Sequence, residues 1–487
     1  MSLRNSSILA KLKKFSFFNS FKHASVYFLG TILIQGLGII SLPVMTYFLS
    51  PEEYGIVNVY LSYTLIASVI FSLNLEWSIT RYFLEPNADK KAFLSTIFTA
   101  VTVLYTASAL IIYLFRIQVG QFLNLSPVLV DWLMFYSYTS IMWYVYLFVR
   151  IAENNSRELT IMQVLNQYLK FAAAVGCIIY LKQSGGSLYM GKIVGEFFVN
   201  TVLALYLFYL LRNYFDFRNM KWAYIKYAAV YSLPLVPYAL GGQILSSFDQ
   251  WYINVELGPE KAGLYSFAYK ISLLMFGLIT ALHNASLVQY TKMMDEKKYE
   301  DVATQSFSIH KLTLLAGLFL ILFSVDLGTL LSAKASFREA LRIVPIIILG
   351  NILYGLAMLY TRIYNYKKTN LFVTVIFLSG AIVNIILNII FVKDYGYEAA
   401  AYTTLFSYAL MAFIAWIIND FWMKFPALPL GKIVLSLLPL FVLTFAFYRL
   451  GWENLGMNFG LIALKILVMI FFGIALFFDT IKKLLKS

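Results

Sequence analysis

The chain has 487 residues, of which 61% are hydrophobic and 13% are charged, and its mean hydropathy is +0.75. Soluble domains are about 45–50% apolar and about 25% charged, so this composition indicates an integral membrane protein. The single cysteine, Cys177, excludes an intrachain disulfide, and one cysteine with three histidines excludes the usual zinc and iron–sulfur spacings. We therefore expect no metal and no cofactor.

Apolar segments long enough to cross a bilayer recur along the whole chain. A membrane-spanning helix needs about 20 such residues. The sequence predicts fourteen of them. They cover approximately 24–49, 54–75, 92–115, 128–149, 159–181, 187–211, 227–255, 262–289, 305–331, 339–361, 370–392, 396–419, 431–448 and 458–478.

Lysine and arginine alternate in abundance between successive connections. If all fourteen segments cross, one side of the membrane holds 25 of the 38 basic residues and the other side holds seven. Basic residues concentrate on the cytoplasmic side, so we expect both termini in the cytoplasm. The net charge of +14 is then explained by topology, and it gives no support to a nucleic-acid partner. The stretch 8–21 reads either as an interfacial amphipathic helix or as a disordered basic tail.

One short turn is written twice. Leu49-Ser50-Pro51-Glu52 with Gly55 returns as Leu257-Gly258-Pro259-Glu260 with Gly263, 208 residues later. A second echo links 178–186 with 389–397 at an offset of 211. Two echoes at nearly one offset predict a duplicated six-helix unit, the parallel-repeat plan of some transporters. The alternative is that both copies are simply good short turns.

The duplication predicts an all-α protein with two parallel six-helix bundles around a central cleft, followed by two further helices. We expect a cytoplasmic N-terminal segment (1–23), bundles at 24–220 and 221–422, and an appended region at 423–487.

Residues 186–192 match most of a phosphate-binding loop, but Ile193 stands where Ser or Thr should bind magnesium. No polar stretch is long enough for a catalytic domain. We thus predict a transporter that is not an enzyme, binds no nucleotide, and draws on an ion gradient or the membrane potential.

Basic residues inside the apolar segments are costly, and they usually face a water-filled interior or a partner. Lys170 is the deepest of these cations, and Lys270, Lys311 and Arg342 lie nearer the segment ends. A cationic cleft suits an anionic substrate such as a carboxylate, phosphate or pyrophosphate. The alternative is that each of these basic side chains extends to the nearest membrane–water interface. Lys465 could do this, or it could face the last two segments.

Acidic residues inside the segments are scarcer. Asp249 is the clearest, and it could be a proton or sodium site or the partner of a nearby cation. Lys192 and Glu196 are spaced to pair on one helix, and Glu196 is a second candidate for ion coupling. The first and seventh segments also contain helix breakers, which could form hinges or static kinks. The candidate hinge residues are Pro43, Pro234, Pro237, Gly241 and Gly242.

Residues 38–63, the following LNLEWSITRYF (73–83) and residues 231–271 resemble bacterial polysaccharide flippases of the Wzx type, in the MOP exporter superfamily. The resemblance covers the first twelve segments. It places Arg81 at the family's Arg-Tyr-Phe stretch, as a further substrate-binding candidate. It also places Asp249 at an Asp-Arg pair, although Gln250 replaces the arginine here.

The resemblance implies movement of undecaprenyl-pyrophosphate-linked oligosaccharide, the precursor of O-antigen, capsule or exopolysaccharide, from the cytoplasmic to the outer leaflet of the bacterial inner membrane. The implied partners are this lipid-linked oligosaccharide, the bilayer and polysaccharide polymerase or assembly proteins. The alternatives are a MATE-like multidrug or metabolite antiporter, a lipid II flippase, and a non-transporting scaffold. An antiporter of that class would favour buried acids over the buried bases found here.

Overall fold

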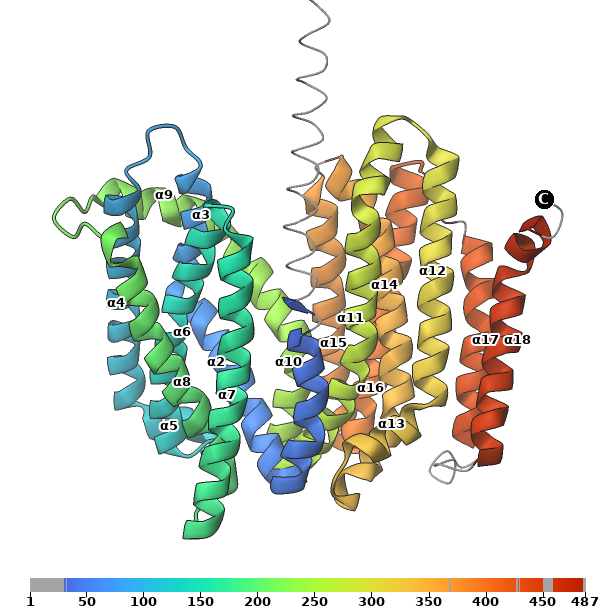
Figure 1. Ribbon diagram of the computed structural model, residues 1–487, viewed down its shortest axis with the longest axis horizontal. Helices are drawn as coiled ribbons and strands as arrows, with labels where there is room; N and C mark the ends of the chain where they lie inside the picture. Colours follow the sequence, from blue (N-terminus) through green and yellow to red (C-terminus); the bar gives the residue numbers. More distant parts are fainter. Residues whose placement is uncertain are drawn as a thin grey trace, which may run out of the picture. The chain divides into compact units, whose positions relative to one another are not determined.

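The computed structural model describes residues 30–31, 33–367, 369–425, 428, 430–449 and 459–484, and within these ranges it contains helices and no strand (Figure 1). Each of the fourteen predicted segments falls on helix there. Ten helices in the described ranges are long and apolar enough to cross a membrane, and two shorter apolar helices cover Leu33–Phe48 and Leu430–Ala446. The predicted all-α membrane fold is confirmed, while the number of spans stays a prediction. The amphipathic stretch 8–21 lies outside the described residues.

The helices group into two compact units. Unit 1 comprises residues 1–41 and 60–240, and unit 2 comprises residues 42–59 and 241–487. The division differs in two places from the bundles that we expected at 24–220 and 221–422. Residues 221–240 belong to unit 1, and residues 42–59 belong to unit 2.

Unit 1 contains the end of α2 (Pro51–Ser72) and the helices that follow it: η1 (Leu75–Trp77), α3 (Ser78–Phe83), α4 (Lys90–Leu114), α5 (Arg116–Leu123), α6 (Pro127–Ala152), α7 (Ser156–Ser184), α8 (Leu188–Leu211), η2 (Arg212–Tyr214), α9 (Trp222–Ser232) and η3 (Leu233–Leu235). The most extensive helix packing in this unit is between α7 and α8, and α8 also packs on α6. Gly191 and Gly195 make the α7–α8 contact possible, because a Cβ at either position would overlap the backbone of α7.

Unit 2 contains the start of α2, most of α10 (Val236–Leu257) and the remaining helices: α11 (Pro259–Asp295), α12 (Tyr299–Leu322), α13 (Ser324–Leu331), η4 (Ala335–Ile343), α14 (Val344–Tyr366), α15 (Asn370–Tyr395), α16 (Tyr397–Ile417), η5 (Ile418–Trp422), α17 (Leu430–Arg449) and α18 (Phe459–Leu484). The centre of this unit is α14, which packs on α11, α12, α15 and α16. In the apolar stretch of Ala335–Tyr366, which contains α14, 89% of the residues are buried. In the apolar stretch of α18, 11% of the residues are buried.

The predicted span 227–255 is broken rather than continuous. Pro234 lies in the short η3 turn between α9 and α10, because proline lacks the amide hydrogen that would continue the helix. Within unit 1, α9 lies across the neighbouring helices instead of along them (Figure 1). Tyr224 and Tyr227 of α9 meet the stacked rings of Tyr82 and Phe93 edge-on, which holds α9 against α3 and α4.

Both copies of the repeated turn begin a helix with proline at its first position: Pro51 begins α2 and Pro259 begins α11. In the second echo, a glycine with a positive φ follows the end of each helix. Gly185 follows α7 with φ +74°, and Gly396 follows α15 with φ +78°, in the region that favours glycine. Both echoes therefore coincide with helix boundaries, while the duplication itself stays a prediction.

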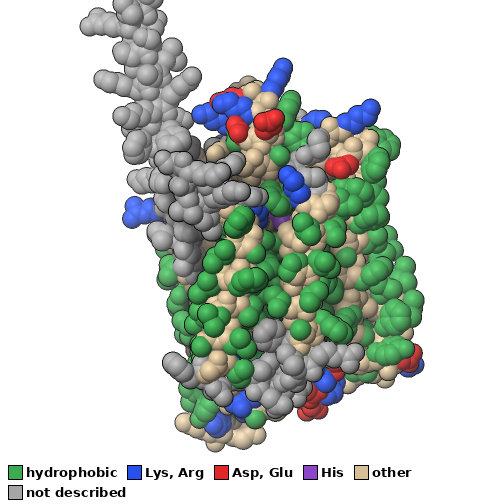
Figure 2. Space-filling model, turned by 90° about the vertical axis from the view of Figure 1, so that its right-hand side faces the viewer, with side chains coloured by type: hydrophobic (Ala, Val, Ile, Leu, Met, Phe, Trp, Pro, Cys, Tyr) green, Lys and Arg blue, Asp and Glu red, His purple; other side chains and the backbone are tan. Residues whose placement is uncertain are grey.

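The described surface fits a bilayer. On the face shown in Figure 2, hydrophobic side chains cover the middle, and charged side chains gather toward the two ends. Along α15, Ile382, Ile386 and Ile389 are each about half exposed at helical spacing. An apolar stripe of this kind would be costly in water but suits contact with lipid chains.

The last two helices are held to the rest of unit 2 by buried polar contacts. His310 of α12 hydrogen-bonds to Ser436 of α17 at 3.1 Å. Lys465 of α18 forms an ion pair with Asp326 of α13, and both side chains are buried. Lys465 therefore neither extends to an interface nor faces only the last two helices. Burial of both charges makes each depend strongly on the other.

Candidate functional site

A buried carboxylate lies at the meeting point of four helices in unit 2. Asp249 of α10 is 4% exposed and accepts hydrogen bonds from the Tyr265 hydroxyl (2.6 Å), the Asn388 amide (2.6 Å) and the Thr404 hydroxyl (2.7 Å). These donors belong to α11, α15 and α16. No basic side chain lies within ion-pair distance of Asp249 among the described residues. The alternative in which Asp249 pairs with a nearby cation is therefore not seen in this conformation.

A second tier of polar side chains surrounds this carboxylate. The Asn388 amide also donates to the Asn384 oxygen, and Thr403 donates to the Asn388 oxygen at 2.8 Å. Asn384 completes the ring through Thr404 at 3.2 Å. The cluster, which we call the Asp249 ring (Asp249, Tyr265, Asn384, Asn388, Thr403 and Thr404), is rich in oxygen atoms. Carboxylate, amide and hydroxyl oxygens can hold a hard cation, and the carboxylate can instead take a proton.

Unit 1 contains a different charged network. Lys170 of α7 donates to the Tyr136 hydroxyl of α6 at 3.3 Å, and this hydroxyl donates to Glu196 of α8 at 3.4 Å. Lys192 lies 3.8 Å from Glu196 one helical turn away, so the predicted pair forms. The Lys170 ammonium has no carboxylate in direct contact among the described residues. An anion that reached this ammonium would therefore meet no competing carboxylate there.

Of the other predicted cations, Arg81 lies in unit 1 with Lys170, whereas Lys270, Lys311 and Arg342 lie in unit 2. Lys270 lies over the Tyr54 ring at 5.1 Å, and Lys311 lies over the Phe477 ring of α18 at 5.5 Å. Arg342 forms ion pairs with Glu339 and Glu398, which offset its charge locally. Arg81 is exposed in the last turn of α3, in unit 1. The roles of all four in substrate binding stay predictions.

One buried cation escaped the sequence reasoning. Arg362 of α14 is 1% exposed and lies one residue beyond the predicted end of its span. Its guanidinium donates to the His283 ring (3.2 Å), the His283 carbonyl (3.0 Å) and the Ser286 hydroxyl (2.7 Å) of α11. The helix continues to Tyr366, so Arg362 stays inside the packing although the apolar run has ended. These contacts tie α14 to α11 and suffice as a structural role.

The candidate hinges lie where the chain passes between the two units. Two of the three boundaries fall after Ser41, two residues before Pro43, and between Leu240 and Gly241. A Cβ added at Gly241 or Gly242 would meet no neighbouring atom, so close packing does not require glycine there. Conformational freedom is the remaining physical reason for glycine inside a helix. Motion at these residues stays a prediction.

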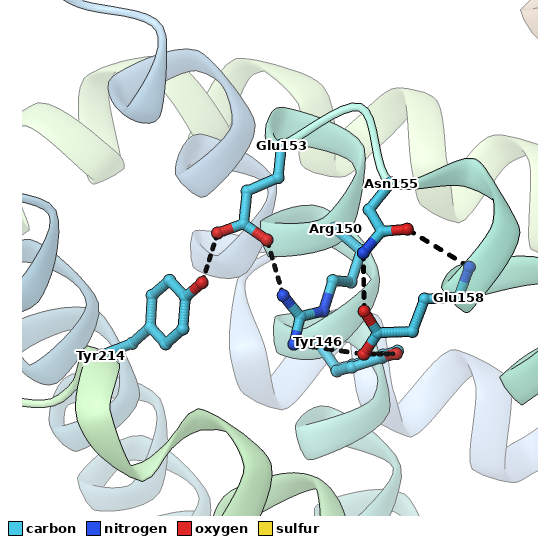
Figure 3. A network of polar contacts seen from close by, with 6 residues as sticks. All are labelled: Tyr146, Arg150, Glu153, Asn155, Glu158 and Tyr214. Carbon is cyan, nitrogen blue, oxygen red and sulfur yellow. Dashed lines mark hydrogen bonds and ion pairs between the residues drawn. The ribbon is translucent and has the colours of Figure 1, made fainter.

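A third polar network fixes the turn between α6 and α7 in unit 1 (Figure 3). Arg150 binds Glu153 at 2.6 Å and Glu158 at 3.2 Å, one on each side of the turn. Tyr214, just after α8, donates to Glu153 at 2.5 Å. The sequence predicts this turn on the cytoplasmic side. The charged groups of this network pair with one another. The network therefore has a structural role, in which it holds together the end of α6, the start of α7 and the end of α8.

Comparison with known proteins supplies the context of these sites. A family model described as "Polysaccharide biosynthesis protein" matches residues 20–288. No curated protein sequence matches the chain significantly. Among solved structures, the chain is similar to "Lipid II flippase MurJ, inward closed conformation", with a TM-score of 0.72, 17% identity, and coverage of 95% of this chain and 100% of the other.

Two MATE transporters are also similar. "Inward-facing conformation of a multidrug resistance MATE family transporter of the MOP superfamily" matches with a TM-score of 0.61, 13% identity, and coverage of 81% of this chain and 94% of the other. "Crystal structure of MATE in complex with MaD3S" matches with a TM-score of 0.55, 14% identity, and coverage of 81% and 93%. Identities this low show the fold alone. The predicted resemblance to the MOP superfamily is confirmed at that level.

Proposed function

Because the chain belongs to the polysaccharide biosynthesis protein family, we propose that it moves undecaprenyl-pyrophosphate-linked oligosaccharide repeat units across the bacterial inner membrane. The direction is from the cytoplasmic to the outer leaflet, with both termini in the cytoplasm. The MOP-type fold supports a transporter that works by alternating access, with the glycan passing through a central cleft and the lipid tail remaining in the bilayer. Gly241 and Gly242 are the proposed hinge residues.

The environment of Lys170 is the observation that supports an anionic substrate. Its ammonium lies within a membrane-spanning helix and contacts a tyrosine hydroxyl instead of a carboxylate. A cation kept in this position is costly unless it has a ligand or a partner for part of the cycle. A pyrophosphate would provide that partner and would compete with the link through Tyr136 to Glu196. Arg81, Lys270, Lys311 and Arg342 are further candidates for contact with the anionic headgroup or glycan.

The Asp249 ring is the proposed site of ion coupling. A carboxylate that joins α10, α11, α15 and α16 can change the packing of all four helices when it gains or loses a cation. Either a proton or a sodium ion fits the chemistry of the ring. Glu196 is a second candidate, since its charge is already shared between Lys192 and Tyr136.

The proposal is tested by the lipid-linked glycans of a strain that lacks this protein, with and without the gene restored. We expect an undecaprenyl-pyrophosphate oligosaccharide to accumulate on the cytoplasmic side, and surface polysaccharide to be lost. Restoring the gene with Lys170→Ala should leave surface polysaccharide low at a normal protein level. Lys182→Ala, an exposed lysine on the same helix, is the matched control and should restore the wild-type phenotype.

The same strains distinguish the two alternatives. Accumulated lipid II with arrested cell-wall synthesis would indicate a lipid II flippase instead. Unchanged lipid intermediates with increased drug sensitivity would indicate a MATE-like antiporter.

A further inference from the structure

The turn that follows α2 places a carboxylate inside unit 1. Helix α2 ends at Ser72, and the next two residues, Leu73 and Asn74, both have φ +52°. Two consecutive non-glycine residues in the left-handed region are uncommon and must be held by their surroundings. They lead the chain into η1, which lies against α3, α4, α6 and α9. As a result, Glu76 of η1 is 3% exposed.

The polar atoms at this turn are incompletely paired. One Glu76 oxygen accepts a hydrogen bond from the Ser72 hydroxyl at 3.2 Å, while the other, Oε2, has no partner. The side-chain amide nitrogen of Asn74, which is 1% exposed, also lacks a partner. Buried polar atoms are nearly always paired, so two orphans at one turn require an explanation.

No positive charge compensates Glu76. No basic side chain among the described residues lies within ion-pair distance of it. The titratable groups that face it are the phenols of Tyr105 on α4 and Tyr144 on α6, and α3 and α9 place no charged group against it within the described chain. The end of α2 adds partial negative charge from its last carbonyls. Burial therefore disfavours the ionised carboxylate and raises the pKa of Glu76 to about 7.

We propose that Glu76 is a proton-binding site of unit 1, separate from the Asp249 ring, and that it carries a proton in the conformation described here. A water-borne proton bonds to Oε2 on binding and returns to water at the predicted cytoplasmic side on release. A metal ion fits less well, because the site assembles one carboxylate and one hydroxyl, whereas hard cations such as Ca²⁺ and Mg²⁺ take about six or more oxygens. The use of this proton in coupling rests on the proposed transport function.

Carbodiimide labelling of the purified full-length protein tests the site without any transport assay. Dicyclohexylcarbodiimide adds to a protonated buried carboxyl group, and mass spectrometry locates the adduct. We expect the initial labelling rate at Glu76 to be about tenfold higher at about pH 6 than at about pH 8, and unchanged by added sodium. Equal rates at both pH values would overturn the proposal. Protection by sodium at constant pH would replace the proton with a metal cation and would equally overturn it.

An infrared measurement guards against a reagent that does not reach the site. The carbonyl-stretch band of a protonated carboxyl group should disappear as the pH rises, and Glu76→Gln should remove that band. Glu52→Gln, at an exposed position of α2, is the matched control and should leave the band in place. Absence of both the adduct and the Glu76-dependent band would refute the site. These readouts are independent of lipid-linked glycan, so a failure of the flippase assay alone would leave the proton site standing.

Discussion

Gly55 and Gly263 pack reciprocally against each other's helix. A Cβ at Gly55 would overlap the carbonyl oxygen of Pro259, and a Cβ at Gly263 would overlap the carbonyl oxygen of Pro51. Both residues belong to unit 2. The repeated turn thus has a physical purpose: its two copies form one symmetric contact, in which each proline carbonyl lies over the other copy's glycine.

Alanine at either glycine should destabilise unit 2. The overlapping atoms are backbone, which cannot move aside as a flexible side chain would, so we expect a loss of about 1–3 kcal/mol in the free energy of unfolding. The double variant Gly55→Ala/Gly263→Ala should lose less than the sum, since both changes open the same contact. Thermal unfolding in detergent measures each value. Gly38→Ala, whose Cβ would meet no atom, is the control, and a similar loss there would contradict the packing argument.

Removing one member of the buried pair Lys465–Asp326 should destabilise the protein more than removing both. Lys465→Met leaves a buried carboxylate without its partner, and Asp326→Asn leaves a buried ammonium; each should cost about 3–5 kcal/mol. The double variant Lys465→Met/Asp326→Asn should recover most of that loss. Unfolding measurements on the four proteins give the coupling energy. If the losses simply add, the pair does not fasten α18 to α13.

Neutralising Asp249 should remove transport and weaken unit 2 moderately. In Asp249→Asn, the new amide group meets hydroxyl or amide donors that previously served the carboxylate, and one unsatisfied donor costs about 1–3 kcal/mol. We expect the protein to reach the membrane but surface polysaccharide to be lost. Asp394→Asn, an exposed carboxylate on α15, should be silent in both measurements. Normal polysaccharide with Asp249→Asn would remove the ring from the coupling scheme.

Glu76 should make the stability of the protein depend on pH in a specific window. Because burial raises the pKa of Glu76 from an ordinary 4.5 to about 7, the folded protein binds a proton that the unfolded chain releases. Its contribution is complete below about pH 4.5 and is lost as the pH rises through about 7. The difference in melting temperature between Glu76→Gln and wild type should therefore grow across this window. Parallel melting curves for the two proteins would mean that Glu76 titrates normally.

Much of the fold could be predicted because apolar length and charge alternation are local properties of the sequence. All fourteen segments fall on helix in the described chain, and the proline starts of α2 and α11 lie where the repeated turn placed them. Asp249 also stood out, as a lone acid in an apolar run. Its ring did not, because Asn388 and Thr404 come from segments more than a hundred residues away and carry no charge.

What remained hidden depends on three-dimensional context. Glu76 lies just after an apolar run, where a carboxylate is normally solvated, and only the two left-handed residues before it turn it inward. Lys465 and Asp326 are 139 positions apart, and nothing in either neighbourhood selects the other. The break at Pro234 was visible as a possible hinge, but the separation of α9 depends on an aromatic cluster contributed by α3 and α4.

Residues 42–59 belong to unit 2, although the residues before and after them belong to unit 1. Neither unit is therefore a continuous piece of chain. A gene fragment that starts near residue 241 would encode most of α10 and the helices α11 to α18, but not the segment that carries Pro51 and Tyr54. Gly263 would then lose the carbonyl that covers it, and Lys270 would lose the ring beneath it. Produced alone, such a fragment should be poorly folded, and co-production with residues 1–240 should rescue it. Unit 2 therefore depends on two separate pieces of chain, and a cut near residue 241 would not yield a self-contained unit.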